Sequence, residues 1–96
     1  MLQTAVKEGE DLSDYYAATF YSVSQALRFE KMLQSKGITV KIIPVPRAIS
    51  SSCGVAARFA PPEYAAVKEL LGEDSVEGIY HLSTDGGKMH AEKVWP

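Results

Sequence analysis

Hydrophobic positions alternate with polar ones along four stretches of the chain, with the period of two that is typical of β-strands. The pattern predicts strands at residues 15–21, 38–45, 55–59 and 76–83. In the first strand, Tyr16, Ala18 and Phe20 fall on one face. We expect the third strand to run centrally in a sheet and to face the core on one side only.

Two stretches between these strands have the 3.6-residue spacing of amphipathic helices. The first begins after Ser22, which stands three residues before Gln25 in a capping-box pattern, and it ends at Gly37. Its expected buried stripe consists of Val23, Ala26, Leu27, Met32 and Leu33. The second begins at Pro61-Pro62-Glu63 and ends at Gly72. Its stripe consists of Tyr64, Val67, Leu70 and Leu71.

The resulting order, β-α-β-β-α-β, is that of an α+β, ferredoxin-like sandwich, in which two helices cover one face of a four-stranded antiparallel sheet. Right-handed crossovers place the strands in the order 4-1-3-2. The second strand then lies at an edge, as Pro44 and Pro46 require, because proline donates no hydrogen bond to a neighbouring strand. The same topology places the loop at 47–54 beside the N-terminus of the first helix.

The pattern divides the chain into three parts. Residues 1–13 are polar and aperiodic and are predicted to be a flexible N-terminal arm, and residues 14–83 form the domain. Residues 84–96 are either a C-terminal tail or an extra hairpin strand that Asp85-Gly86-Gly87 would fold back.

Composition and charge narrow the classes of partner. The 96 residues are 46% hydrophobic, an ordinary globular mixture, and 10 Lys and Arg against 12 Asp and Glu leave a net charge of −2. Binders of nucleic acids or anionic membranes carry a basic surplus, so we expect neither partner. A single cysteine cannot form an internal disulfide, and the opening residues lack the apolar segment of a secretory signal, which predicts a cytoplasmic location.

The loop between the second and third strands, PVPRAISSSCG at 44–54, contains the chain's one cysteine, Cys53. A thiol reacts as its thiolate, which cations, helix N-termini and N–H donors stabilise. Arg47 supplies a cation, the three serines supply hydroxyl and amide donors, and Gly54 lets the backbone turn. The serines are Ser50, Ser51 and Ser52. The alternative is that Cys53 is a small packed hydrophobe in a solvated loop.

Three segments resemble the Se/S carrier protein-like family, a small domain found alone or fused to a sulfur-carrier module of the TusA type. They are TFYSVSQALRFEKML at 19–33, which includes Ala26 and Glu30, IIPVPR at 42–47 and ISSSCG at 49–54. The resemblance implies a cysteine that carries sulfur or selenium as a persulfide or selenosulfide. The signature that it implies consists of Pro46, Arg47, Ser51, Cys53 and Gly54.

The sequence thus predicts a sulfur or selenium carrier whose acceptor is Cys53, with Ser22, Glu30 and Pro46 in supporting positions. Its partners would be donor and acceptor proteins or small thiols. Without a second cysteine the chain has no resolving thiol, which favours a carrier or binding protein over a stand-alone enzyme. His81 and His90 have no metal-ligand spacing with Cys53, so we expect no metal and no cofactor.

A competing hypothesis is a non-catalytic adaptor or regulatory module. In it the loop binds an anion or a small ligand, and Cys53 is a packing residue. The open face of the sheet would then bind a partner or a second copy of the chain. That face was expected to expose Tyr15, Ala17, Thr19 and Arg58.

Overall fold

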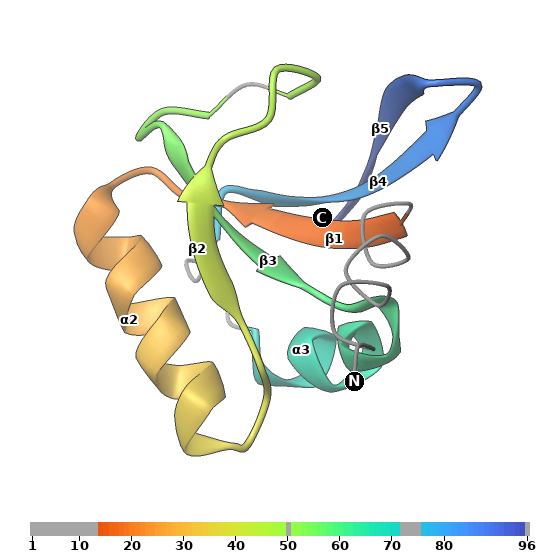
Figure 1. Ribbon diagram of the computed structural model, residues 1–96. Helices are drawn as coiled ribbons and strands as arrows, with labels where there is room; N and C mark the ends of the chain where they lie inside the picture. Colours follow the sequence, from red (N-terminus) through yellow and green to blue (C-terminus); the bar gives the residue numbers. More distant parts are fainter. Residues whose placement is uncertain (1–13, 50, 72–75, 96) are drawn as a thin grey trace, which may run out of the picture.

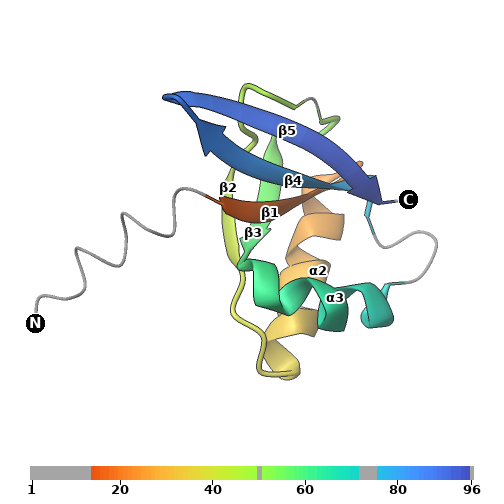
Figure 2. The ribbon, with the colours of Figure 1, turned by 90° about the vertical axis from the view of Figure 1, so that its right-hand side faces the viewer.

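The computed structural model describes residues 14–49, 51–71 and 76–95. The elements in chain order are β1 (Asp14–Thr19), α2 (Val23–Ser35), β2 (Lys41–Pro44), β3 (Val55–Phe59), the 3₁₀ turn η1 (Pro61–Glu63), α3 (Tyr64–Leu70), β4 (Gly78–Asp85) and β5 (Lys88–Trp95). All strands join one antiparallel sheet in the order β2-β3-β1-β4-β5 (Figure 1). The described helices, α2 and α3, lie on the same side of the sheet (Figure 2).

This arrangement confirms the α+β fold and the predicted neighbours of the first four strands, with β2 at an edge and β3 central. The expected strand number was wrong, because the sheet has five strands and not four. Gly86 and Gly87 both adopt positive φ, at 61° and 83°, as the two central residues of a tight hairpin turn require. The chain therefore reverses after β4, and β5 pairs along it from Asp85↔Lys88 to Ile79↔Trp95.

Helix α2 begins as the capping-box pattern predicts. The Ser22 hydroxyl accepts a hydrogen bond from Gln25 N at 3.2 Å, and the Gln25 side chain accepts one from Tyr21 N at 2.7 Å. Its buried face differs from the predicted stripe and consists of Ala26, Phe29 and Leu33. Val23 and Leu27 are about half exposed, at 50% and 53%. At 100° per residue they lie roughly a quarter turn or more from the centre of the buried face, so this part of the stripe was wrong.

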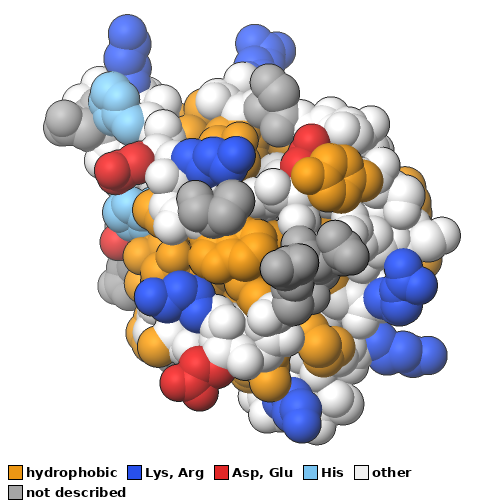
Figure 3. All heavy atoms as spheres, turned by 180° about the vertical axis from the view of Figure 1, so that it is seen from behind, with side chains coloured by type: hydrophobic (Ala, Val, Ile, Leu, Met, Phe, Trp, Pro, Cys, Tyr) orange, Lys and Arg blue, Asp and Glu red, His pale blue; other side chains and the backbone are white. Residues whose placement is uncertain are grey.

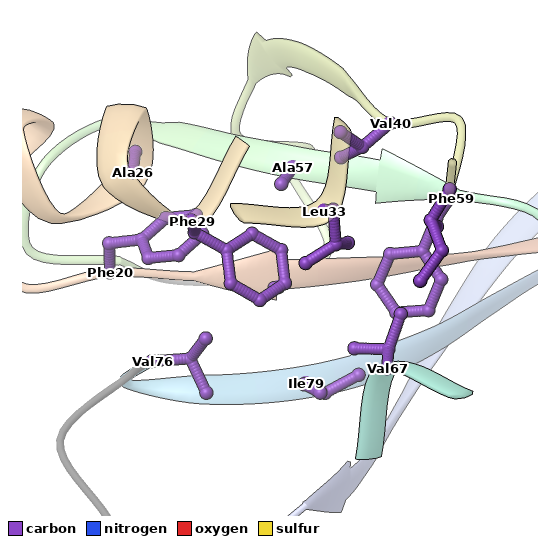
Figure 4. Packing of buried hydrophobic residues seen from close by; sticks show 12 residues of the cluster. Phe20, Ala26, Phe29, Leu33, Val40, Ala57, Phe59, Val67, Val76 and Ile79 are labelled. Carbon is purple, nitrogen blue, oxygen red and sulfur yellow. The ribbon is translucent and has the colours of Figure 1, made fainter. Parts of the chain in front are cut away.

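The main core lies between the sheet and the helices. In Figure 4, Phe29 and Leu33 of α2 lie in the same cluster as Ile79 of β4 and Val67 of α3. The Phe20 and Phe29 ring centroids are 5.2 Å apart. These contacts hold α2 against the sheet.

The opposite face of the sheet is also buried. A second cluster there contains Tyr15, Ala17, Ile49, Ala56 and Leu82. This corrects two expectations, because β3 buries side chains on both faces and the face proposed as a docking surface is not open. Tyr15, Ala17 and Thr19 are at most 7% exposed, and the guanidinium of Arg58 lies 4.6 Å from the centre of the Tyr15 ring.

The remaining features concern the surface and the ends of elements. Neither described helix is long and apolar enough to cross a membrane. On the face shown in Figure 3, Lys and Arg side chains are scattered and do not gather into one patch. The predicted arm at 1–13 and the predicted helix end at Gly72 lie outside the described residues.

Truncating Phe29 should test the corrected face of α2. Phe29→Ala removes a buried ring and is expected to lower the free energy of unfolding by about 3–5 kcal/mol. Leu27→Ala, the matched control at a predicted core position, should change it by about 0.5 kcal/mol or less because Leu27 is exposed. Urea unfolding measures both, and similar losses in the two variants would contradict the observed packing.

The stability of the fold should fall at alkaline pH through Tyr64. Burial, and then the nearby Tyr16, raise the pKa of Tyr64 above its ordinary value of about 10. The unfolded chain therefore ionises first, so this stabilisation is complete below pH ~10 and is lost as the pH rises through the folded-state pKa. Tyr64→Phe should flatten this part of the profile when unfolding is measured between pH 8 and 11, and an unchanged slope would contradict the assignment.

Candidate functional site

The loop from Val45 to Gly54 is closed at its base by backbone contacts that continue the β2–β3 pairing. Val45 N donates to Gly54 O at 3.0 Å. Further along, Ile49 N donates to Pro46 O at 3.1 Å, which closes a turn with Arg47 exposed at its tip. Ile49 is buried in the second cluster, so the loop is anchored on the face of the sheet opposite the helices.

Cys53 lies between the surface and the core. Its side chain is partly buried and packs against the main cluster, and its thiol donates to Val55 O at 3.5 Å. Its backbone N–H donates to the Ser51 hydroxyl at 3.4 Å. Gly54 follows with a φ of +82°, a left-handed conformation that glycine adopts without steric cost. Cys53 as a residue is intermediate in exposure, and its neighbours Ser52 and Gly54 are exposed.

Glu77, which the sequence analysis did not select, is the main partner of the serines. Its carboxylate accepts hydrogen bonds from the Ser52 hydroxyl at 3.0 Å, from Ser52 N at 3.3 Å and from the Ser51 hydroxyl at 3.4 Å. Its own N–H donates to Thr19 O at 2.7 Å. Glu77 thus connects the loop to the end of β1.

The strand topology predicted from the sequence could have identified Glu77 as a neighbour of the cysteine loop. The sheet pairs Thr19 at the end of β1 with Gly78 at the start of β4. In an antiparallel sheet the residue just before β4 therefore lies at the end of β1 where the chain turns into α2. The same reasoning placed the cysteine loop there, and the Ser51 hydroxyl is 3.3 Å from Phe20 O, two residues before the N-cap of α2.

The structure brings part of the predicted site together. Ser51, Ser52, Cys53 and Gly54 share one loop beside the start of α2. Arg47 belongs to the same loop, but no hydrogen bond or ion pair within the described ranges joins it to Cys53. Its role as a stabilising cation stays a prediction.

The other predicted residues lie elsewhere or act locally. Ser22 caps its own helix, and the Pro46 carbonyl closes the loop turn. Glu30 is half-buried on α2, and no hydrogen bond in the part of the chain that the structure describes joins it to the loop. Ser50 lies outside the described residues.

The two histidines are separate from the cysteine loop. His81 Nε2 lies 2.5 Å from Asp14 Oδ1, and its ring is tilted against that of Tyr16 with centroids 4.9 Å apart. His90 is exposed on β5, opposite Ser83. Among the residues described, no group of three or more His, Cys, Asp and Glu is placed to hold a metal ion.

These features define a small α+β domain with a single, partly buried cysteine in the loop between β2 and β3. Residues 15–81 match the family model described as "Putative Se/S carrier protein-like", and because this range covers well over half of the chain, the protein belongs to that family. The match confirms the resemblance seen in the sequence and includes the cysteine loop and Glu77, whereas β5 lies beyond it. Comparison with curated proteins found no match, and comparison with solved structures found none either.

The backbone at Gly54 should tolerate few substitutions. Gly54→Ala places a Cβ on a left-handed residue and should cost about 1–2 kcal/mol of stability, although no atom lies within 4 Å of that position to clash with it. Gly54→Asn should cost less, because asparagine adopts this conformation more readily. Thermal unfolding gives the order, and an alanine variant as stable as wild type would show that the loop does not need the left-handed turn.

Proposed function

We propose that this protein carries sulfur or selenium on Cys53, as a persulfide or a selenosulfide. The observation that carries the proposal is the position of Cys53 within the range matched by the Se/S carrier family, in a loop where this residue is only partly buried. Packing against the core gives the thiol a defined place, while the exposed residues on either side leave a path for a donor.

The chemistry of loading requires one cysteine. The Cys53 thiolate attacks the terminal sulfur of a donor persulfide, R–S–SH, and forms a new S–S bond. The S–S bond of the donor breaks, and its electron pair leaves with the thiolate R–S⁻. The transfer is neither a net oxidation nor a net reduction, so the protein needs no resolving thiol. A donor R–S–SeH would transfer selenium by the same displacement.

The persulfide that results is acidic and is stabilised as its anion by positive charge and by hydrogen-bond donors. In our proposal Arg47 supplies the positive charge from the exposed turn of the same loop. The first turn of α2 adds the positive end of the helix dipole on the side where Ser51 meets Phe20. Gly54, which follows the cysteine with a left-handed backbone, would let the loop turn at the sulfur.

The adaptor hypothesis has weaker support. Its docking surface was the open sheet face, and three of the four residues chosen for it, Tyr15, Ala17 and Thr19, are buried. The donors that would form its anion site, on Ser51 and Ser52, are directed to Glu77. Among the described residues, no contact therefore favours a binding role over the carrier role.

Sulfur loading provides the direct test. Incubated with glutathione persulfide, the wild-type protein should gain the mass of one sulfur atom, and dithiothreitol should remove it. Cys53→Ser should gain nothing while keeping the fold, because serine is nearly isosteric with cysteine. Intact-mass spectrometry measures the gain, and urea unfolding checks the fold. A wild-type protein that gains no sulfur, or a serine variant that still does, would refute the proposal.

A further inference from the structure

The hydrogen-bond donors of the cysteine loop already have an anionic partner. The hydroxyl and the backbone N–H of Ser52 both donate to the Glu77 carboxylate, at 3.0 and 3.3 Å. The Ser51 hydroxyl has one hydrogen and two acceptors within reach, Glu77 Oε1 at 3.4 Å and Phe20 O at 3.3 Å. Both donors of Ser52 are therefore engaged by a carboxylate, and the Ser51 hydroxyl is shared between that carboxylate and Phe20 O.

Glu77 is held in this position from its own backbone. Its N–H donates to Thr19 O at 2.7 Å, immediately before β4 begins, and its side chain is half-buried. The link to the cysteine is short, because the hydroxyl of Ser51 that lies beside Glu77 also accepts the N–H of Cys53. The hydroxyl of Ser51 thus lies between the Glu77 carboxylate and the backbone N–H of Cys53.

This charge opposes loading in two ways. An ionised carboxylate only accepts hydrogen bonds, so a donor that it holds is not available to a second anion in the loop. Two anions in a partly desolvated loop also repel each other. A persulfide is a stronger acid than the thiol from which it forms, so loading favours an anion near the carboxylate that binds the loop serines.

We propose that Glu77 is a positioning residue that withholds the donors of Ser51 and Ser52 from the sulfur on Cys53, and so limits how firmly that sulfur is held. The inference rests on the proposed carrier function. Unloading is the reverse displacement, in which an acceptor thiolate A–S⁻ attacks the terminal sulfur of Cys53–S–SH. A–S–SH forms, the S–S bond at Cys53 breaks, and Cys53 leaves as its thiolate. A carrier must release the sulfur that it carries. Glu77 keeps the loaded state from becoming so stable that an acceptor thiol cannot remove the sulfur.

The first test is the loading equilibrium in a glutathione persulfide and glutathione buffer. Glu77→Gln keeps the size of the side chain and removes its charge, and it should raise the ratio of loaded to unloaded Cys53 by about three- to tenfold. Glu69→Gln makes the same charge change on α3, far from the loop (Figure 1), and should leave the ratio within about 1.5-fold. Glu77→Asp, which withdraws the carboxylate by one methylene, should give an intermediate ratio.

A purely structural role for Glu77 predicts that Glu77→Gln does not raise the loading ratio. If Glu77 only held the loop in place, Glu77→Gln would lower the stability and leave the loading ratio unchanged or reduced, and that result overturns the inference. Intact-mass spectrometry after trapping with an alkylating reagent gives the ratio, and urea unfolding gives the stability.

A second readout separates this inference from the carrier function. The rate of Cys53 alkylation by anionic iodoacetate, divided by the rate with neutral iodoacetamide, reports how the loop receives an anion and does not depend on sulfur loading. Glu77→Gln should raise this quotient severalfold, whereas Glu69→Gln should not change it. If the quotient rises but no variant takes up sulfur, the role of Glu77 stands and the carrier function fails. If wild type takes up sulfur but Glu77→Gln changes neither the loading ratio nor the alkylation quotient, the carrier function stands and the role of Glu77 is refuted.

Discussion

The antiparallel pairing of β1 with both β3 and β4 is the constraint on which the rest of the structure depends. Thr19, at the end of β1, pairs with Ala56 on one side and with Gly78 on the other. Because both neighbours run opposite to β1, they begin where it ends. The cysteine loop that precedes β3, Glu77 before β4 and the start of α2 therefore meet at one end of the sheet.

Small residues at the centre of this sheet let both faces be covered closely. Ala17, Ala18, Ala56 and Ala57 on β1 and β3 are fully buried, and they alternate between the two clusters. Larger side chains there would hold α2 away on one face and the loop around Ile49 away on the other. The loop thus rests on a packed surface, which gives Cys53 a defined position although it lies outside the regular strands.

In the proposed carrier, some groups near Cys53 stabilise a sulfur anion and one group, the Glu77 carboxylate, opposes it. In the proposed carrier role, the start of α2 and Arg47 would stabilise a sulfur anion at Cys53, whereas the Glu77 carboxylate accepts hydrogen bonds from the serines of the loop. Such a balance suits a carrier better than a storage protein, because a carried atom has to be both accepted and released.

The sequence by itself determined the features that depend on neighbouring residues: the strand and helix order, the cap at Ser22, the edge position that prolines impose on β2, and the loop that holds Cys53. It predicted part of the buried face of α2 wrongly, because hydrophobic spacing alone did not distinguish exposed Leu27 from buried Phe29. Only the tertiary structure decided that the hairpin adds a fifth strand, that the second face of the sheet is covered, and that Glu77 binds the serines. These outcomes depend on contacts between residues far apart in the chain, such as the 25 positions that separate Ser52 from Glu77, and periodicity carries no information about such pairs.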